Sequence, residues 1–265
     1  MSDLPELHWS KLRNMARSPA HYFYECSAER TATPAMLLGT AVHTRVLGPG
    51  PAHHDDVVIY DGARRGNAWR DFKAAHPGRA IVTAKEFDRD TARSKQMALA
   101  VLTDPAAAPY LEGTREQELR WTVAGRQCAG RVDVRGSALV ELKTVFDANP
   151  VRFYWHALRM GYLGQLGWYA DGIVAAGHPA PTHAVIIAVE SKPPHPVVVY
   201  ELTEAALALG RQQWRGLFER LRVCEDSGVW PGYAIGPVAL DVPESDDVVL
   251  DFGDEADPDS AEAAQ

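Results

Sequence analysis

Two carboxylates and a lysine on a hairpin-like stretch are the residues of this sequence whose types and spacing could do chemistry. In GRVDVRGSALVELKT, residues 130–144, two apolar runs flank the turn-forming residues RGS. Asp133 ends the first run, and Glu141 and Lys143 stand two positions apart in the second. Because successive side chains of a strand point to opposite faces, Glu141 and Lys143 lie side by side on one face.

Burial of these three charged groups needs a physical reason, because it costs free energy unless the charges pair or hold a metal ion. A structural salt bridge is one interpretation. In the other, Asp133 and Glu141 chelate Mg²⁺, which takes one or two carboxylates and completes its octahedron with water and substrate phosphate. The ion would lower the pKa of a bound water, and Lys143 could orient that water or stabilise the transition state. The hairpin alone leaves both interpretations open.

The acid-x-Lys pattern by itself is not a signal. About one such triplet is expected by chance, and the sequence contains three: Asp71-Phe-Lys73, Glu141-Leu-Lys143 and Glu190-Ser-Lys192. The first lies in the polar, loop-like stretch 61–80, where a helix is the alternative and no strand aligns the triplet. The third runs into two prolines, which is typical of a solvated strand end. Only the Glu141 triplet follows an aspartate on the adjoining strand.

Residues elsewhere in the chain could complete a site around the hairpin. His43 lies four positions after Gly39 on the apolar segment 35–47, a predicted buried helix; the alternative for it is a satisfied core histidine. Gln165 and Tyr169, also four apart, share a face of a helix predicted over residues 150–176, and the alternative for them is an ordinary helix surface. The start of that helix has a composition suited to phosphate contacts and base stacking: Arg152, Phe153, Tyr154, His156 and Arg159.

The elements that must position these residues are helices around a mixed sheet. Strands are predicted over residues 117–123, 127–134, 138–145, 184–190 and 197–202, and further helices over residues 83–102 and 203–225. This order predicts a single α/β or α+β domain over residues 1–240, with a central mixed β-sheet flanked by helices.

The net charge of −8 is concentrated at the end of the chain. Residues 241–265 contain ten acidic residues and no lysine or arginine, which leaves 27 basic and 25 acidic residues in positions 1–240. The near-neutral body neither supports nor excludes a DNA partner. We expect the acidic segment to be a disordered, solvating tail; a docking segment or an acidic mimic of DNA is the alternative.

Cysteine usage and hydropathy exclude several classes of protein. The three cysteines, Cys26, Cys128 and Cys224, include no CxxC pair, which argues against a cysteine-bound zinc or iron–sulfur cluster. The first twelve residues lack the features of a signal peptide. The longest apolar run, residues 184–189, is too short to cross a bilayer. We therefore expect a cytoplasmic protein with no membrane association.

In their order and spacing, these segments resemble the PD-(D/E)XK nuclease superfamily in its RecB-like branch, and most closely the nuclease domain of RecE-type exonucleases (exodeoxyribonuclease VIII). The resemblance rests on Gly39-x-x-x-His43, Gly130-Arg-Val-Asp133, Glu141-Leu-Lys143 and Gln165-x-x-x-Tyr169. The segments SPAHY, LGTAVHT, VTAKE, IAVE and WPGY add to it, and it extends to about residue 233. It implies a restriction-endonuclease-like core.

The resemblance also implies an activity and partners. Such a protein is a Mg²⁺-dependent exonuclease, in which Mn²⁺ can substitute and no iron–sulfur cluster takes part. It degrades linear double-stranded DNA 5′→3′ and leaves 3′ single strands for recombination by a RecT-type annealing protein. It is expected to form a homotetrameric ring. The competing hypotheses are a non-catalytic DNA- or partner-binding module on this fold, and an endonuclease of the same superfamily.

Carried over residue by residue, the resemblance assigns roles. The implied metal ligands are His43, Asp133, Glu141 and the backbone carbonyl of Leu142, and Lys143 acts as the catalytic lysine beside Asp133 and Glu141. Gln165 and Tyr169 shape the site and touch the DNA backbone, while Arg131 lies beside Asp133. A glutamate on the strand before the hairpin is also expected; Glu116 and Glu118 both qualify, and Glu116 is preferred.

Overall fold

The structure is a computed structural model, and it describes residues 5–28, 32–48, 57–234 and 236–239. The acidic segment predicted as a tail lies outside the described residues. The described strands are β1 (Leu7–His8), β2 (Val57–Ile59), β3 (Ala80–Val82), β4 (Thr114–Val123), β5 (Arg126–Arg135), β6 (Leu139–Val145), β7 (Ala184–Glu190) and β8 (Val197–Glu201). The α-helices are α1 (Trp9–Leu12), α2 (Pro19–Ser27), α3 (Pro34–Leu47), α4 (Gly66–Ala75), α5 (Ala84–Thr103), α6 (Pro150–Met160), α7 (Tyr162–Ala175) and α8 (Glu204–Ser227), with 3₁₀ turns at Arg13–Ala16 and Ala108–Leu111.

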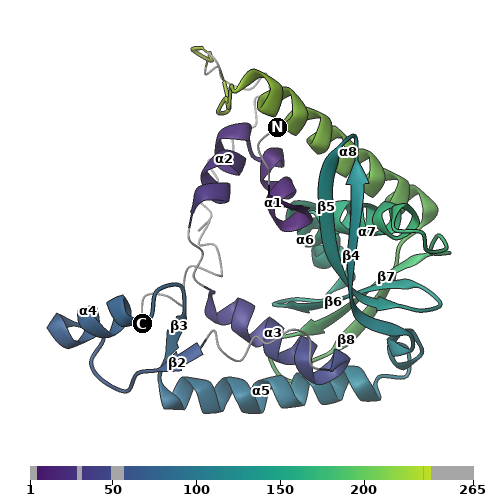
Figure 1. The fold of residues 1–265 in the computed structure, drawn as a ribbon. Coiled ribbons are helices and arrows are strands. Elements are labelled where there is room, and N and C mark those ends of the chain that lie inside the picture. Colours follow the sequence, from purple (N-terminus) through teal and green to yellow (C-terminus); the bar gives the residue numbers. More distant parts are fainter. Residues whose placement is uncertain (1–4, 29–31, 49–56, 235, 240–265) are drawn as a thin grey trace, which may run out of the picture.

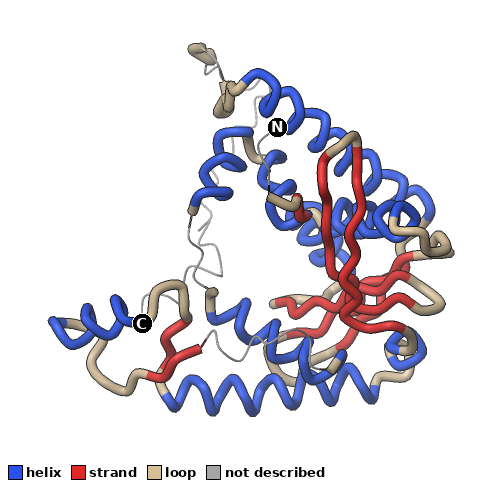
Figure 2. The backbone as a smooth tube through the Cα atoms, viewed as in Figure 1, coloured by secondary structure: helices blue, strands red, loops and turns tan. Residues whose placement is uncertain are grey.

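A mixed sheet forms the centre of the molecule (Figures 1 and 2). Its strand order is β1-β5-β6-β7-β8, with β4 on the other side of β5, and β2 and β3 form a separate parallel pair. Strand β6 runs parallel to β7 along its whole length, whereas β4 and β5 are antiparallel. The predicted mixed sheet flanked by helices is therefore confirmed.

Helices cover both faces of the sheet, and β7 shows why. Along β7, Ala184, Ile186 and Ala188 belong to the hydrophobic core beneath α7 and α8, whereas the residues between them, Val185, Ile187 and Val189, belong to the core beneath α3 and α5. A strand buried on both faces needs a continuous apolar run rather than alternation, as the sequence AVIIAV provides. None of the described helices combines the length and apolarity needed to cross a bilayer.

Two predictions of local structure are wrong. The single helix predicted over residues 150–176 is divided into α6 and α7 by Gly161, whose φ of +72° belongs to the left-handed region and ends α6. The polar stretch 61–80, predicted as a loop, contains α4. No residue of α4 is fully buried, and its apolar face is short: Trp69 and Phe72 are half buried against Tyr60 among polar and small residues.

Helices α7 and α8 cross in backbone contact, and this contact fixes the helix that carries Gln165 and Tyr169. A Cβ atom on Gly210 of α8 would lie 2.0 Å from the Leu163 carbonyl oxygen of α7. Glycine is the residue type that allows such an approach.

We predict that Gly210→Ala lowers the free energy of unfolding by about 1–3 kcal/mol, because the added methyl group forces the two helices apart. Gly216→Ala is the matched control on the same helix. It is exposed, with no atom within 4 Å of its added Cβ, and should stabilise the protein by about 0.5–1 kcal/mol. Urea unfolding followed by circular dichroism measures both, and equal effects of the two substitutions would contradict the close crossing.

Candidate metal centre

The centre begins where β5 and β6 separate. Only two register pairs join these strands, Val134↔Val140 and Arg135↔Leu139. At the next step along β5, the Oδ2 atom of Asp133 accepts a hydrogen bond of 2.7 Å from the backbone N–H of Leu142. The side chain thus satisfies a buried donor that the diverging partner strand leaves unpaired. This bond fixes the Asp133 carboxylate in the opening between the two strands.

Two further potential ligands converge on Asp133. His43 comes from α3, and its Nδ1 atom lies 3.6 Å from Asp133 Oδ2. Glu116 comes from β4, between the register pairs that place Arg115 and Gln117 against β5. One ligand atom from each of His43, Glu116 and Asp133 lies within 4.8 Å of the other two. Such a set of one imidazole and two carboxylates suits a divalent cation.

Glu116 has an unusual backbone for its position. Its φ of +49° lies in the left-handed region, which residues other than glycine seldom adopt. Strained backbone of this kind persists where the surrounding structure holds it, often at functional sites. Glu118, the other candidate, is half exposed and lies outside the three-residue group. The structure therefore brings Glu116, rather than Glu118, to the centre.

Glu141 and Lys143 form a second group beside the first. Lys143 Nζ donates to Glu141 Oε1 at 2.6 Å and to Gln165 Oε1 at 3.0 Å. Gln165 Nε2 in turn donates to Glu141 Oε1 at 2.8 Å and to the Tyr169 hydroxyl at 3.3 Å. The predicted shared face of Glu141 and Lys143, and that of Gln165 and Tyr169, are both present. Together the four side chains form one closed hydrogen-bond network.

Two glycines let the helices approach this network. A Cβ atom on Gly130 would lie 2.6 Å from the ring of Tyr169, so the missing side chain makes room for that ring against β5. A Cβ atom on Gly39 would lie 3.2 Å from Thr144 Oγ1, so α3 passes close to β6. The spacing of Gly39 and His43 thus combines close approach with a potential ligand one helical turn later.

Tyr162 is a site residue that sequence reasoning missed. The Lys143 ammonium group lies 4.6 Å from the centroid of its ring, a distance that allows a cation–π interaction. Tyr162 is the first residue of α7, directly after the break at Gly161. The sequence signal for Tyr162 is Gly161. A glycine that ends one helix and precedes the next would have placed Tyr162 at the start of a new helix.

Burial sets the charge states of the centre. It raises the pKa of Asp133 to about 7 and, together with the charge of Asp133, raises the pKa of Glu141 to about 7. Burial also lowers the pKa of His43. For Lys143, burial favours the neutral form, but the Glu141 carboxylate leads the contributions that hold its pKa above the ordinary value. Shifts of this kind concentrate at functional sites.

The residues present fit a divalent cation. Glu141 Oε2 is buried and has no hydrogen-bond partner among the described residues, which is the state of an oxygen that lacks its ligand rather than one in a finished salt bridge. Of the predicted ligands, His43 and Asp133 thus meet in one group with Glu116. Glu141 belongs to the neighbouring network of Lys143 and Gln165, and Leu142 is bound to Asp133 through its backbone N–H.

The predicted DNA-contacting arginines fall into two groups. Arg131 lines the same pocket as the centre, a cavity of about 330 Å³ along α3, and lies 3.6 Å from Glu116 and 3.4 Å from Glu118. Arg152 instead pairs with Asp147 at 2.9 Å, and Arg159 is exposed on α6. Within the described part of the chain, no ion pair joins Arg152 or Arg159 to the centre.

Comparison with known proteins agrees with this geometry. Residues 9–236 match the family described as a PDDEXK-like domain of unknown function (DUF3799). The chain belongs to this family. The resemblance to the PD-(D/E)XK superfamily is thereby confirmed, together with its α/β core of a mixed sheet and flanking helices.

Solved structures support the fold alone. A crystal structure from Eubacterium rectale, described as a "putative exonuclease", is similar with a TM-score of 0.60 and 15% sequence identity, over 91% of this chain and 91% of that one. A second structure, SSO0001, also has 15% identity, over 83% of this chain and 88% of that one; its TM-score of 0.27 is too low to support an argument. No curated protein matches the sequence.

The raised pKa of Glu141 predicts a pH-dependent stability in the metal-free protein. Its pKa rises from 4.5 to about 7 on folding, so the folded state binds more protons between these values and stability falls as pH rises through this range. The effect of Glu141→Gln on the melting temperature in EDTA should therefore be more favourable at pH 8 than at pH 5. Glu118→Gln, the same change at an exposed glutamate, is the reference. If the effect of Glu141→Gln on the melting temperature depends on pH no more than that of Glu118→Gln, the pKa of Glu141 is not raised in the folded protein.

Proposed function

We propose that this protein is a Mg²⁺-dependent exodeoxyribonuclease that degrades linear double-stranded DNA 5′→3′. The observation that carries the proposal is the buried group of Asp133, Glu141 and Lys143 at the opening between β5 and β6, in a chain of the PDDEXK-like family. Mn²⁺ is expected to substitute for Mg²⁺. The alternative of a finished structural salt bridge accounts less well for the unpartnered oxygen of Glu141.

The chain's own residues divide the work between the two groups. His43, Glu116, Asp133 and Glu141, with the Leu142 carbonyl, would hold the cation. A bound Mg²⁺ lowers the pKa of water and neutralises charge on a phosphate. Lys143 keeps its positive charge at neutral pH because its pKa is raised, and it stabilises negative charge that develops on the scissile phosphate.

The remaining residues orient Lys143 and the DNA. Gln165 binds both Lys143 and Glu141, so it holds the ammonium group in one direction, and Tyr169 holds Gln165. Arg131, on the wall of the pocket, would contact a phosphate of the incoming strand. Arg152 and Arg159 on α6 would contact the DNA backbone farther from the cleaved bond.

The wider role rests on the resemblance to RecE-type exonucleases. We propose that the product is a 3′ single-stranded overhang, which a RecT-type annealing protein uses in recombination. A homotetrameric ring around duplex DNA and a cytoplasmic location belong to the same proposal.

We predict that Lys143→Ala lowers the rate of DNA cleavage by about 10²-fold or more, because it removes the positive charge at the developing negative charge. Binding of Mn²⁺, measured by calorimetry, should persist, since every potential ligand remains. Lys192→Ala is the matched control: it belongs to another acid-x-Lys triplet, and its ammonium group lies over the ring of Phe146. It should cleave DNA at the rate of the unaltered protein. Full activity of Lys143→Ala would refute the role assigned to this lysine.

We also predict that linear duplex DNA is consumed in Mg²⁺ while closed circular DNA of the same sequence persists. Release of label from a duplex marked at a single 5′ or 3′ end then gives the polarity, and early release from the 5′ end is expected. Equal loss of the circle would indicate an endonuclease of the same superfamily. Absence of cleavage with either Mg²⁺ or Mn²⁺ would favour a non-catalytic binding module.

A further inference from the structure

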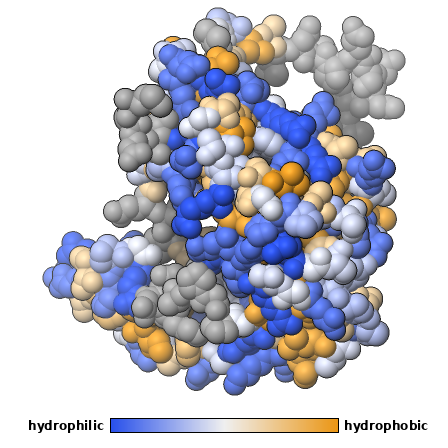
Figure 3. All heavy atoms as spheres, turned by 45° about the vertical axis from the view of Figure 1, so that its right-hand side comes forward, coloured by the Kyte–Doolittle hydropathy of each residue, from blue (hydrophilic) through white to orange (hydrophobic). Residues whose placement is uncertain are grey.

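A second pocket of about 400 Å³ lies outside the candidate centre, and the chemistry above does not use it. It is lined by α4, the turn that follows it, β3 and the start of α3. We term residues 57–82, which comprise β2, α4 and β3, the α4 lobe. In Figure 1 this lobe stands apart from the central sheet, and in Figure 3 its visible face is mainly hydrophilic.

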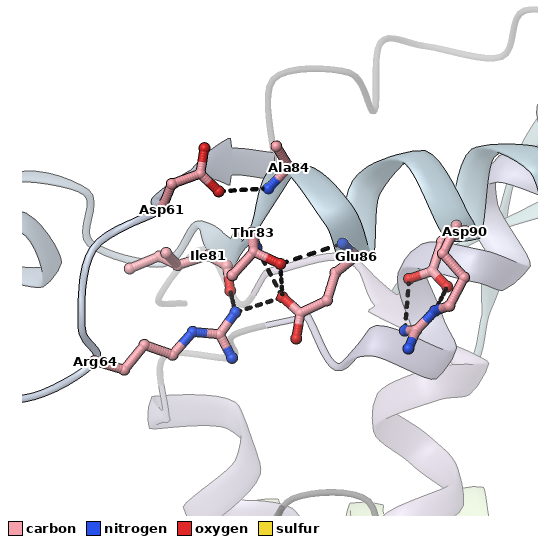
Figure 4. Close-up of polar contacts among 8 residues, drawn as sticks. Asp61, Arg64, Ile81, Thr83, Ala84, Glu86 and Asp90 are labelled. Atoms are coloured by element: carbon pink, nitrogen blue, oxygen red, sulfur yellow. Dashed lines mark hydrogen bonds and ion pairs between the residues drawn. The ribbon is translucent and has the colours of Figure 1, made fainter.

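The α4 lobe is attached to the start of α5, which fixes its pocket in place (Figure 4). Asp61 Oδ1 accepts a hydrogen bond of 2.8 Å from the Ala84 N–H, and Arg64 donates to Glu86 Oε2 at 2.5 Å. Glu86 also completes a capping box with Thr83 at the start of α5. Since α5 packs on α3, these bonds hold the lobe relative to the helix that carries His43.

The pocket has the chemistry of a nucleic-acid site. The lobe holds five basic and two acidic residues, a net charge of +3 in a chain of net charge −8. Its basic wall is formed by Lys73 and Arg79. The guanidinium of Arg79 donates to the Val57 carbonyl at 3.3 Å through Nη2, while its buried Nε has no hydrogen-bond partner among the described residues, so the hydrogen-bonding capacity of this side chain is only partly used within the protein.

Aromatic rings complete the pocket. Trp69 lies on its wall, half buried, with its ring 5.2 Å from that of Tyr60. Tyr60 is packed in turn against Phe72 at 4.6 Å. A supported ring beside cationic groups is the combination that binds single-stranded nucleic acid, by stacking bases on the ring and placing phosphates against the cations. In a duplex, base faces are already covered by their neighbours, so this pocket suits an unpaired base.

Helix α3 connects this pocket to the metal centre. Its first two turns line both cavities: Leu37 belongs to the pocket of the lobe, and Met36 and Thr40 belong to the pocket of the centre, which continues to His43. Leu37 and His43 are about 9 Å apart along the helix axis, at about 1.5 Å per residue. The two pockets therefore border the same helix within about two turns.

We propose that the pocket of the α4 lobe binds an unpaired nucleotide of the DNA strand that enters the metal centre. The base stacks on Trp69, while Lys73 and Arg79 bind its phosphates. The identity of the ligand as DNA rests on the proposed function; the preference for a single strand rests on the pocket itself.

Fluorescence anisotropy with a labelled single-stranded oligonucleotide tests the proposal, in EDTA so that the strand stays intact. Trp69→Ala and Lys73→Glu should each weaken binding about fivefold or more. Lys73→Gln should reduce the slope of the logarithm of the binding constant against the logarithm of salt concentration by about 0.7. Arg70→Glu is the matched control, because Arg70 lies on the same exposed helix but not on the pocket wall. It should leave affinity within about twofold of the unaltered protein.

The outcomes separate this proposal from the proposed function. If the unaltered protein cleaves DNA while Trp69→Ala and Lys73→Glu bind the strand normally, the strand-binding role of the pocket is refuted and the proposed exonuclease function is retained. If it binds the strand through these residues but cleaves no DNA, the function is wrong and the pocket stands. Three results would each contradict the proposed role of the pocket. They are an equal loss of affinity in Arg70→Glu, equal losses of affinity for a blunt duplex, and no binding of the single strand by the unaltered protein. Unfolding curves of Lys73→Glu, an exposed substitution, establish that loss of binding is not loss of the fold.

Discussion

The hydrogen bond from the Leu142 N–H to the Asp133 carboxylate is the constraint on which the rest of the centre depends. It forms where β5 and β6 cease to pair. It therefore marks the end of the backbone pairing between these strands and fixes the position of Asp133 where they separate. Without an internal acceptor, the Leu142 N–H would be a buried unpaired donor. The side chain of Asp133 therefore has two roles. Its Oδ2 atom accepts the hydrogen bond that stabilises the strand geometry, and its carboxylate contributes negative charge to the centre.

This arrangement places two carboxylates in a region that disfavours their charge. Burial is the main cause of the raised pKa of both Asp133 and Glu141. Neighbouring acids add to it, because Glu116 raises the pKa of Asp133 and Asp133 raises the pKa of Glu141. Lys143 compensates Glu141 in part, but it contacts one oxygen and leaves the other without a described partner. Two buried carboxylates in close proximity disfavour the folded state when both are ionised, so their presence is more readily explained by ligand binding than by stability.

Much of this centre could be predicted from the sequence because it depends on local periodicity. Alternation along β6 is enough to put Glu141 beside Lys143, and helical spacing is enough to pair Gln165 with Tyr169. The choice between Glu116 and Glu118 was harder: alternation puts both on one face, and the left-handed backbone that distinguishes Glu116 depends on tertiary structure. The position of Tyr162 likewise depends on Gly161, whose left-handed φ and close approach to the ring of Trp9, 3.1 Å from an added Cβ atom, become evident only in the tertiary structure.

The two hydrophobic cores explain why residues so distant in sequence meet. Core packing beneath α7 and α8 positions Gln165 and, through it, Lys143; packing beneath α3 and α5 positions His43. Strand β6 is shared by both cores, with Leu139 in one and Val140 in the other. The group of His43, Glu116 and Asp133 thus lies toward α3, and the network of Glu141, Lys143 and Gln165 lies toward α7; the two adjoin where β5 and β6 cease to pair. Since α3 also borders the pocket of the α4 lobe, a strand bound there would reach the centre from the face that carries His43, with Lys143 on its far side.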